Sequence, residues 1–226
     1  MIQIDISFIL PTNREYSLYS QKVINNINSL NFFGRTHEIV VVSPNEIKGK
    51  NVVYVPEPED SHGCVSAINE GFKKSAGDYI FLCSDDHYFN VDCCNMIDIL
   101  ESQLFKDRKY KVACLPTNNH GPCKLPEYCE SGDEIIARFP VYSRETIEVH
   151  LDGYVFHPSF KHHYSDNWLG YWLGQQGEPA IEVDKFDMIT FNNSCDTIHD
   201  EHDEKVFKTL IANFEKTDKR YVSDDF

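Results

Sequence analysis

The strongest constraint on this chain is the alternation of short apolar segments with segments of helical spacing along its first half. Residues 38–43 (EIVVVS) are a continuous apolar run, typical of a strand that is buried on both faces of a parallel sheet. Residues 16–30 instead place Val23 and Ile27 on one face of a helix. This alternation predicts an α/β fold with a mostly parallel sheet covered by helices.

Each predicted element has its own signal in the sequence. Strands are predicted where apolar residues run together and end at turn residues, and helices where apolar residues recur every three or four positions. The predicted strands are residues 4–10, 38–43, 52–55, 79–83 and 111–115, followed by strand-like segments near 180–183 and 187–191. The predicted helices are residues 16–30, 63–75, 91–105 (with Ile97, Leu100 and Leu104 aligned), 143–150 (capped by Ser143), 165–175 and 203–215. Residues 116–134 are expected to form a long loop and residues 153–163 an irregular aromatic segment.

Composition limits the classes of protein to consider. The chain has 226 residues, 41% of them hydrophobic, which is enough for one domain over residues 1–226. A net charge of −15 argues against nucleic acid or an anionic membrane surface as the main partner. No apolar stretch is long enough to span a bilayer, and the first residues lack the basic start of a signal peptide. We therefore expect a cytoplasmic protein whose eight cysteines are free thiols.

Polar residues follow three of the predicted strands. In parallel sheets, ligands bind beyond the carboxyl ends of the strands, because those ends meet at one edge. The residues at these strand ends are Pro11, Thr12, Asn13, Arg14, Ser43, Asp85 and Asp86. Their placement predicts a binding site at this edge of the sheet.

Asp85 and Asp86 stand side by side at the end of a buried strand, where their like charges repel. A divalent cation, Mg²⁺ or Mn²⁺, that is bound by one or both carboxylates and holds a diphosphate would offset that repulsion. The alternative is a solvated aspartate-rich turn or a helix-capping pair, which is the usual meaning of an isolated Asp-Asp. The position after a central strand favours the metal. His87 is either a further ligand or a surface residue.

Two other candidates have weaker signals. Asp166 lies in the first turn of a predicted helix, where it either complements the helix dipole or, with Ser165 as the cap, acts as a general base toward an acceptor hydroxyl. His199 lies in IHDEHDE and is either a late metal ligand or part of a solvated acidic turn, which the spacing alone favours. The aromatic residues within 168–172 either stack on a sugar ring or belong to the core.

These segments together resemble a glycosyltransferase of the GT-A fold, from the large family 2 group, and the resemblance covers most of the chain. The segments that carry it are ISFILPTNRE (6–15), HEIVVVSP (37–44), GCVSAINEGFKKSAGDYIFLCSDD (63–86), FPVYSRETIEVHLDGYVFHPSF (139–160) and HYSDNWLGYWLGQQG (163–177).

The resemblance implies a GT-A sheet with helices on both faces, a nucleotide-binding half (1–115) and an acceptor-binding half (116–226). It implies a metal-dependent, inverting transfer of a sugar from a nucleoside-diphosphate sugar to a hydroxyl of a glycan, lipid or other acceptor, with Mn²⁺ or Mg²⁺ as cofactor. The residues implied to bind the donor nucleotide are Pro11, Thr12, Asn13, Arg14, Ser43, Asn69 and Asp85. Asp86 and His199 would contact the metal or diphosphate, and Asp166 would be the general base.

Two other functions remain in view. A sugar-phosphate nucleotidyltransferase would need a glycine-rich basic loop after the first strand, and PTNRE is not such a loop. A degenerate glycosyltransferase would bind nucleotide-sugar or glycan without turnover. Ser43 and Cys83 stand where many family members have aspartate, which keeps this alternative open.

Overall fold

The computed structural model describes residues 3–12, 18–59, 63–90, 94–118, 136–183, 188–190, 200–214 and 219–222. Its strands are β1 (Ile6–Pro11), β2 (His37–Ser43), β3 (Val52–Pro56), β4 (Tyr79–Leu82), β5 (His87–Phe89), β6 (Val112–Cys114), β7 (Pro140–Ser143), β8 (Ile181–Glu182) and β9 (Met188–Thr190). Its helices are α1 (Leu18–Ser29), α2 (Cys64–Lys74), α3 (Cys94–Glu101), α4 (Gln103–Lys106), the π-helical turn η1 (Thr146–His150), α5 (Ser165–Gln175) and α6 (Asp200–Asn213).

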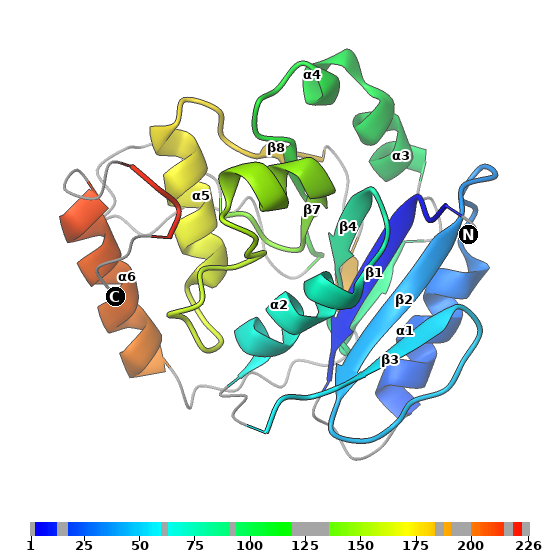
Figure 1. Cartoon of the computed structure of the whole chain (residues 1–226). Coiled ribbons are helices and arrows are strands. Elements are labelled where there is room, and N and C mark those ends of the chain that lie inside the picture. The colour runs from blue at the N-terminus through cyan, green and yellow to red at the C-terminus, as the bar shows by residue number, and fades with distance from the viewer. Residues whose placement is uncertain are drawn as a thin grey trace.

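Seven strands form one twisted sheet in the order β3-β2-β1-β4-β7-β6-β8, most of which Figure 1 labels. Strand β5 pairs with β9 in a separate small sheet. The first four strands of that order run parallel, β7 is antiparallel to both of its neighbours, and β8 is parallel to β6. Pro11 of β1 lies opposite Val42 of β2, so the carboxyl ends of these strands are level. The predicted mostly parallel sheet is confirmed, and it draws strands from both halves of the chain.

The sheet is covered on both faces because residues of its strands alternate between two cores. Phe8 and Leu10 of β1 face the core formed with α1, α3 and α4, whereas Ile9 faces the core formed with α2, η1, α5 and α6. Figure 1 shows α2 in front of the sheet and α1 behind it. Gly71 lets α2 approach closely, because a Cβ there would lie 2.7 Å from Cγ2 of Ile9. Helices on both faces are therefore confirmed.

Several predicted boundaries were wrong. The helix predicted over residues 91–105 is two helices, because Ser102 ends α3 and its hydroxyl accepts a hydrogen bond from Phe105 N (3.2 Å) to cap α4. Leu104, predicted to face inward, is 61% exposed, and Phe105 is buried instead. Strands β5 and β7 were not predicted, and the last helix begins at Asp200 rather than near residue 203.

Other local predictions were confirmed. Ser143 Oγ accepts a hydrogen bond from Thr146 N (3.2 Å), as the cap of the helical segment that follows it. Trp168 and Trp172 are buried in the core, which settles them as packing residues. Cys64, Cys83 and Cys114 are free thiols, as expected. None of the helices that the structure describes is both long enough and apolar enough to cross a bilayer.

Candidate active site

The carboxyl ends of β1, β2 and β4 bring predicted site residues together. Thr12 N donates to Val42 O (2.9 Å), which holds the end of β1 beside β2. The Thr12 hydroxyl donates to Asp85 Oδ2 (2.7 Å) and accepts a hydrogen bond from Ser20 Oγ of α1 (3.2 Å). Thr12 and Asp85 are both buried. The predicted convergence of the first and fourth strand ends is thus a direct contact between two side chains.

Asp86 is held by partners of its own. Ser84 Oγ donates to its Oδ1, and His87 Nδ1 lies 2.6 Å from the same oxygen. His87 Nε2 in turn lies 2.9 Å from Thr190 Oγ1, on the strand β9 that pairs with β5. Asp86 keeps 15% of its side chain exposed. The two adjacent carboxylates are therefore oriented by different groups, and His87, with 12% of its side chain exposed, does not lie on an open surface.

Ser43 lies at the same edge of the sheet. Its hydroxyl donates to Asn45 O (2.6 Å), and its carbonyl accepts a hydrogen bond from Glu57 N (3.1 Å). The side chain is buried. These bonds shape the turn that leaves β2 next to Thr12. Pro11 is the last residue of β1.

Asn69, which was predicted to bind the donor, holds backbone instead. Its Nδ2 donates to Phe156 O (2.9 Å), and its Oδ1 accepts hydrogen bonds from Val155 N (3.0 Å) and Phe156 N (3.2 Å). The side chain is 5% exposed. Because both the Nδ2 and the Oδ1 of Asn69 bond to backbone, this side chain fixes the irregular segment 153–163 against α2. This arrangement favours a supporting role over direct contact with a donor.

Asp166 is the second residue of α5, as predicted. Ser165 is not the cap: Tyr164, in the left-handed conformation (φ 59°), precedes the helix without a side-chain cap. Asp166 Oδ1 accepts a hydrogen bond from Asn167 N (2.9 Å), and Ala137 N donates to the Asp166 carbonyl (3.2 Å).

The Asp166 carboxyl is partly exposed, yet protein surrounds it closely enough that burial raises its pKa. The positive charge of Arg138 opposes that shift. A carboxylate with a raised pKa accepts a proton more readily near neutral pH. The electrostatics at Asp166 therefore suit a general base.

The two aspartates after β4 fit a hard divalent cation. Carboxylate oxygens are the ligands that Mg²⁺ and Mn²⁺ prefer, and sites of this kind commonly take only one or two carboxylates, with phosphate and water completing the shell. Within the described ranges, no group of three His, Cys, Asp or Glu side chains could by itself hold a metal ion. One or both of Asp85 and Asp86 would therefore supply a partial shell. Asn13, Arg14 and His199 lie outside the described residues.

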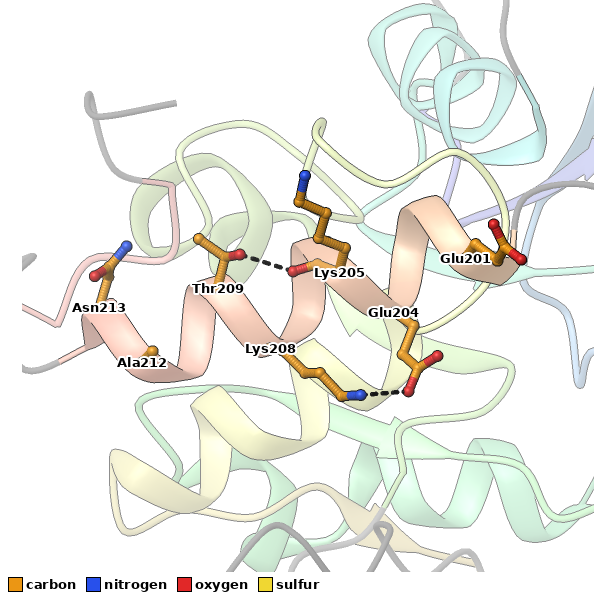
Figure 2. Close-up of a pocket in the computed structure, with 7 residues that line it drawn as sticks. All are labelled: Glu201, Glu204, Lys205, Lys208, Thr209, Ala212 and Asn213. Carbon is orange, nitrogen blue, oxygen red and sulfur yellow. Dashed lines mark hydrogen bonds and ion pairs between the residues drawn. The ribbon is translucent and has the colours of Figure 1, made fainter.

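A shallow hollow on the outer face of α6 lies elsewhere (Figure 2). It is lined by residues of that helix alone, between Glu201 and Asn213. Lys208 pairs with Glu204 (2.6 Å), and Thr209 Oγ1 donates to Lys205 O (2.8 Å). These are contacts of a solvated helix face, so this hollow is not the candidate site.

Some residues of the site were missed from the sequence. Thr190 and Arg138 carry no motif, and their relation to Asp86 and Asp166 comes from contacts between distant segments. His87 was considered only as a ligand or a surface residue. Its position directly after the Asp pair was the one available signal.

Comparison with known proteins agrees with this architecture. Residues 20–102 match the model of the family described as glycosyl transferase family 2. No curated protein matches the sequence of the chain. The match therefore runs from α1 to the end of α3 and includes β2, β3, α2, β4, the Asp pair and β5.

Solved structures share the fold at low sequence identity. A crystal structure of S. aureus TarS 1–349 is 14% identical with a TM-score of 0.61, over 94% of this chain and 72% of that one. A crystal structure of S. aureus TarS is 13% identical with a TM-score of 0.63, over 93% of this chain and 40% of that one. The mannosyltransferase PcManGT from Pyrobaculum calidifontis is 15% identical with a TM-score of 0.59, over 84% and 57%.

The fold and the partial family match agree with each other. The chain has the GT-A glycosyltransferase fold, and its residues 20–102 carry the family 2 pattern. The resemblance drawn from the sequence is thereby confirmed for the fold and for the family 2 pattern of residues 20–102. The chain spans only 40% of the longer TarS chain and 57% of the mannosyltransferase.

Proposed function

We propose that this chain transfers a sugar from a nucleoside-diphosphate sugar to an acceptor hydroxyl, with inversion and with a divalent cation. The observation that carries the proposal is the edge where Thr12 holds Asp85 (2.7 Å) beside a separately oriented Asp86. Among the structural relatives, TarS 1–349 has been solved with UDP-GlcNAc and the mannosyltransferase with GDP-Man and Mn²⁺. Both complexes support a donor of this class here.

The proposed roles divide along the chain. Residues 1–115 would bind the nucleotide, through Pro11, Thr12 and Asp85 with Asn13, Arg14 and Ser43 near the base and ribose. Asp86 and His199 would hold Mg²⁺ or Mn²⁺ against the diphosphate. Bound there, the cation would offset the negative charge that develops on the leaving diphosphate. Residues 116–226 would bind the acceptor, whose identity the fold leaves open.

The chemistry assigned to the chain itself is proton transfer and orientation. The acceptor oxygen attacks the anomeric carbon from the face opposite the diphosphate, its proton passes to the Asp166 carboxylate, and the bond between that carbon and the diphosphate oxygen breaks. Attack from the opposite face inverts the configuration. Asp85 and Asp86 would act by fixing the donor in place, which is worth most when the groups are oriented before the reaction.

A thermal-shift panel tests the proposal directly. The chain is melted with UDP, GDP, CDP and dTDP, each with and without Mn²⁺, as wild type and as Asp86→Ala. One nucleotide at about 100 times its Kd should raise Tm by about 5–10 °C, only with Mn²⁺. The shift should vanish in Asp86→Ala and persist in Asp98→Ala, which removes an exposed aspartate of α3.

The outcomes separate the alternatives. A metal-dependent shift together with release of nucleoside diphosphate from the matching nucleotide sugar supports the transferase. A shift without any turnover would make the chain a degenerate binding domain. The absence of a shift with all four nucleotides would contradict nucleotide binding and leave the Asp85–Asp86 pair with a structural role.

A further inference from the structure

A fully buried carboxylate on α6 holds the turn that precedes Asp166. Asp203 is 0% exposed, and it accepts three hydrogen bonds from successive backbone N–H groups. Oδ1 accepts from Lys161 N (2.9 Å), and Oδ2 accepts from His162 N (2.8 Å) and His163 N (2.7 Å). Consecutive N–H groups that converge on one anion form a strong, charge-assisted anchor. The turn 161–163 is thereby fixed to α6.

The same turn is held on its other side by α2. Val65 N donates to Lys161 O (3.1 Å), and Cys64 Sγ donates to His162 O (3.8 Å). Gly63 precedes α2 with φ +131°, and a Cβ there would lie 2.2 Å from Lys161 O. The backbone of 161–163 thus lies between two helices that are about 140 residues apart in the sequence, and each contributes hydrogen bonds to it.

The direction of the first turn of α5 depends on this junction. Tyr164 follows the turn with a left-handed backbone and gives α5 no side-chain cap. Its ring packs on Phe207 of α6, with ring centroids 5.6 Å apart. Asp166 comes two residues later. In Figure 1, α5 and α6 lie side by side. The turn that leads into the first residues of α5, and so to Asp166, is therefore held by contacts with α6 and α2.

We propose that Asp203 is a positioning residue for the reaction, which aims Asp166 at the acceptor hydroxyl by fixing the turn 161–163. The proposal rests on the function proposed above, with Asp166 as the base. Asp203 itself is enclosed by protein and does not touch substrate. It acts through the backbone, since the loss of its two oxygens would leave three part-buried N–H groups without this acceptor.

The test compares Asp203→Asn with wild type. Asparagine keeps the shape and one acceptor oxygen but turns an NH₂ group toward backbone N–H groups. We expect kcat to fall at least tenfold, while KM for the nucleotide sugar and the nucleotide-dependent Tm shift stay within twofold of wild type. The pH at which kcat/KM reaches half of its maximum should also move, because the surroundings of the Asp166 carboxyl change. The matched control is Glu204→Gln, on the outer face of α6 (Figure 2), whose kcat should stay within twofold.

A second measurement keeps the proposal independent of turnover. Hydrogen exchange of amides 161–167 should be at least tenfold faster in Asp203→Asn and unchanged in Glu204→Gln. If Asp203→Asn does not fold, Asp203→Glu, which keeps the charge but shifts the carboxylate, takes its place in both measurements. A variant with wild-type kcat and wild-type exchange overturns the positioning role. Absence of turnover in the wild type contradicts the proposed function instead, and exchange alone then decides whether Asp203 fixes the turn.

Discussion

At the scale of single residues, the candidate site separates its carboxylates by environment. Asp85 is bonded by the Thr12 hydroxyl and Asp86 by Ser84 and His87, at the end of β4. Asp166 lies on another segment, where burial raises its pKa. Carboxyl groups held in such different surroundings can take different roles, with Asp85 facing the donor, Asp86 as an oxygen ligand for a cation and Asp166 as a proton acceptor.

Replacing Asp166 by Asn should abolish transfer. General base catalysis contributes roughly 100-fold to 10,000-fold, so turnover should fall by at least about 100-fold, while the metal-dependent nucleotide shift remains. In the wild type, kcat/KM should rise with pH as Asp166 loses its proton, through a pKa raised by burial. Steady-state rates of the wild type and of Asp166→Asn, measured across pH, test both expectations. Turnover retained in Asp166→Asn would remove Asp166 as the base.

Asp166→Asn should also change the stability of the folded chain. Because the pKa of Asp166 is raised in the folded chain, the stabilising contribution of the neutral form is lost as pH rises through that pKa. Ionised Asp166 at pH 7 therefore carries a cost that Asn does not. The Tm of Asp166→Asn at pH 7 should equal or exceed that of wild type, in contrast to its activity.

At the scale of elements, the small β5–β9 sheet links the Asp pair to a distant part of the chain. Thr190 N donates to Asn118 Oδ1 (3.0 Å), and Asn118 N donates to Met188 O (3.2 Å), so β9 is tied to the segment that follows β6. Thr190 of β9 also contacts His87, and His87 in turn contacts Asp86. The position of β9 therefore affects the orientation of a proposed metal ligand.

Thr190→Val should weaken the cation site without unfolding the chain. Valine keeps the shape of threonine and its backbone bonds but removes the hydroxyl that lies 2.9 Å from His87 Nε2. Partners that orient a metal ligand typically change metal affinity by 10-fold to 100-fold. The Kd for Mn²⁺ in the presence of the bound nucleotide, measured by thermal shift, should rise roughly tenfold. Ile189→Val, at an exposed position on the same strand, is the control, and equal Kd values in the two variants would exclude this link.

At the scale of the whole molecule, a buried histidine ties the end of the chain to the core. His157 is 0% exposed, and its backbone N donates to the Tyr221 hydroxyl (3.1 Å). Its ring contacts Phe160, Trp168 and Tyr221. Burial lowers the pKa of His157 from 6.5 to about 4. Protonation of this side chain therefore works against the folded state as a whole.

The sign of the pH effect follows from that shift. Unfolded His157 takes up a proton near pH 6.5, and the folded chain does so only near pH 4, so stability falls as pH drops between these values. The loss across that range is about 3 kcal/mol, since each pKa unit corresponds to about 1.4 kcal/mol. His157→Gln should lose less stability than wild type between pH 7 and pH 5, measured by urea unfolding. Parallel losses in the two proteins would contradict the assignment.

Much of the fold could be predicted because its signals are local. The apolar run of β2 and the helical spacing of α1 and α2 lie within single segments, and the structure has these elements within two residues of the predicted ends. The contact between Thr12 and Asp85 was also accessible, because parallel strands carry their carboxyl ends to one edge. A family resemblance then supplied roles that no spacing could assign.

The sequence alone therefore determined the order of the elements from β1 to β4, the sheet edge and the Asp pair at that edge. Only the tertiary structure decided that Asn69 bonds to the backbone of Phe156 and that Thr190 contacts His87, the partner of Asp86. It also decided that Asp203 holds the turn before Asp166. The reason is physical. Hydrophobic periodicity acts between near neighbours, whereas these hydrogen bonds join residues 40 to 103 positions apart, and the packing of helices on the sheet brings them together.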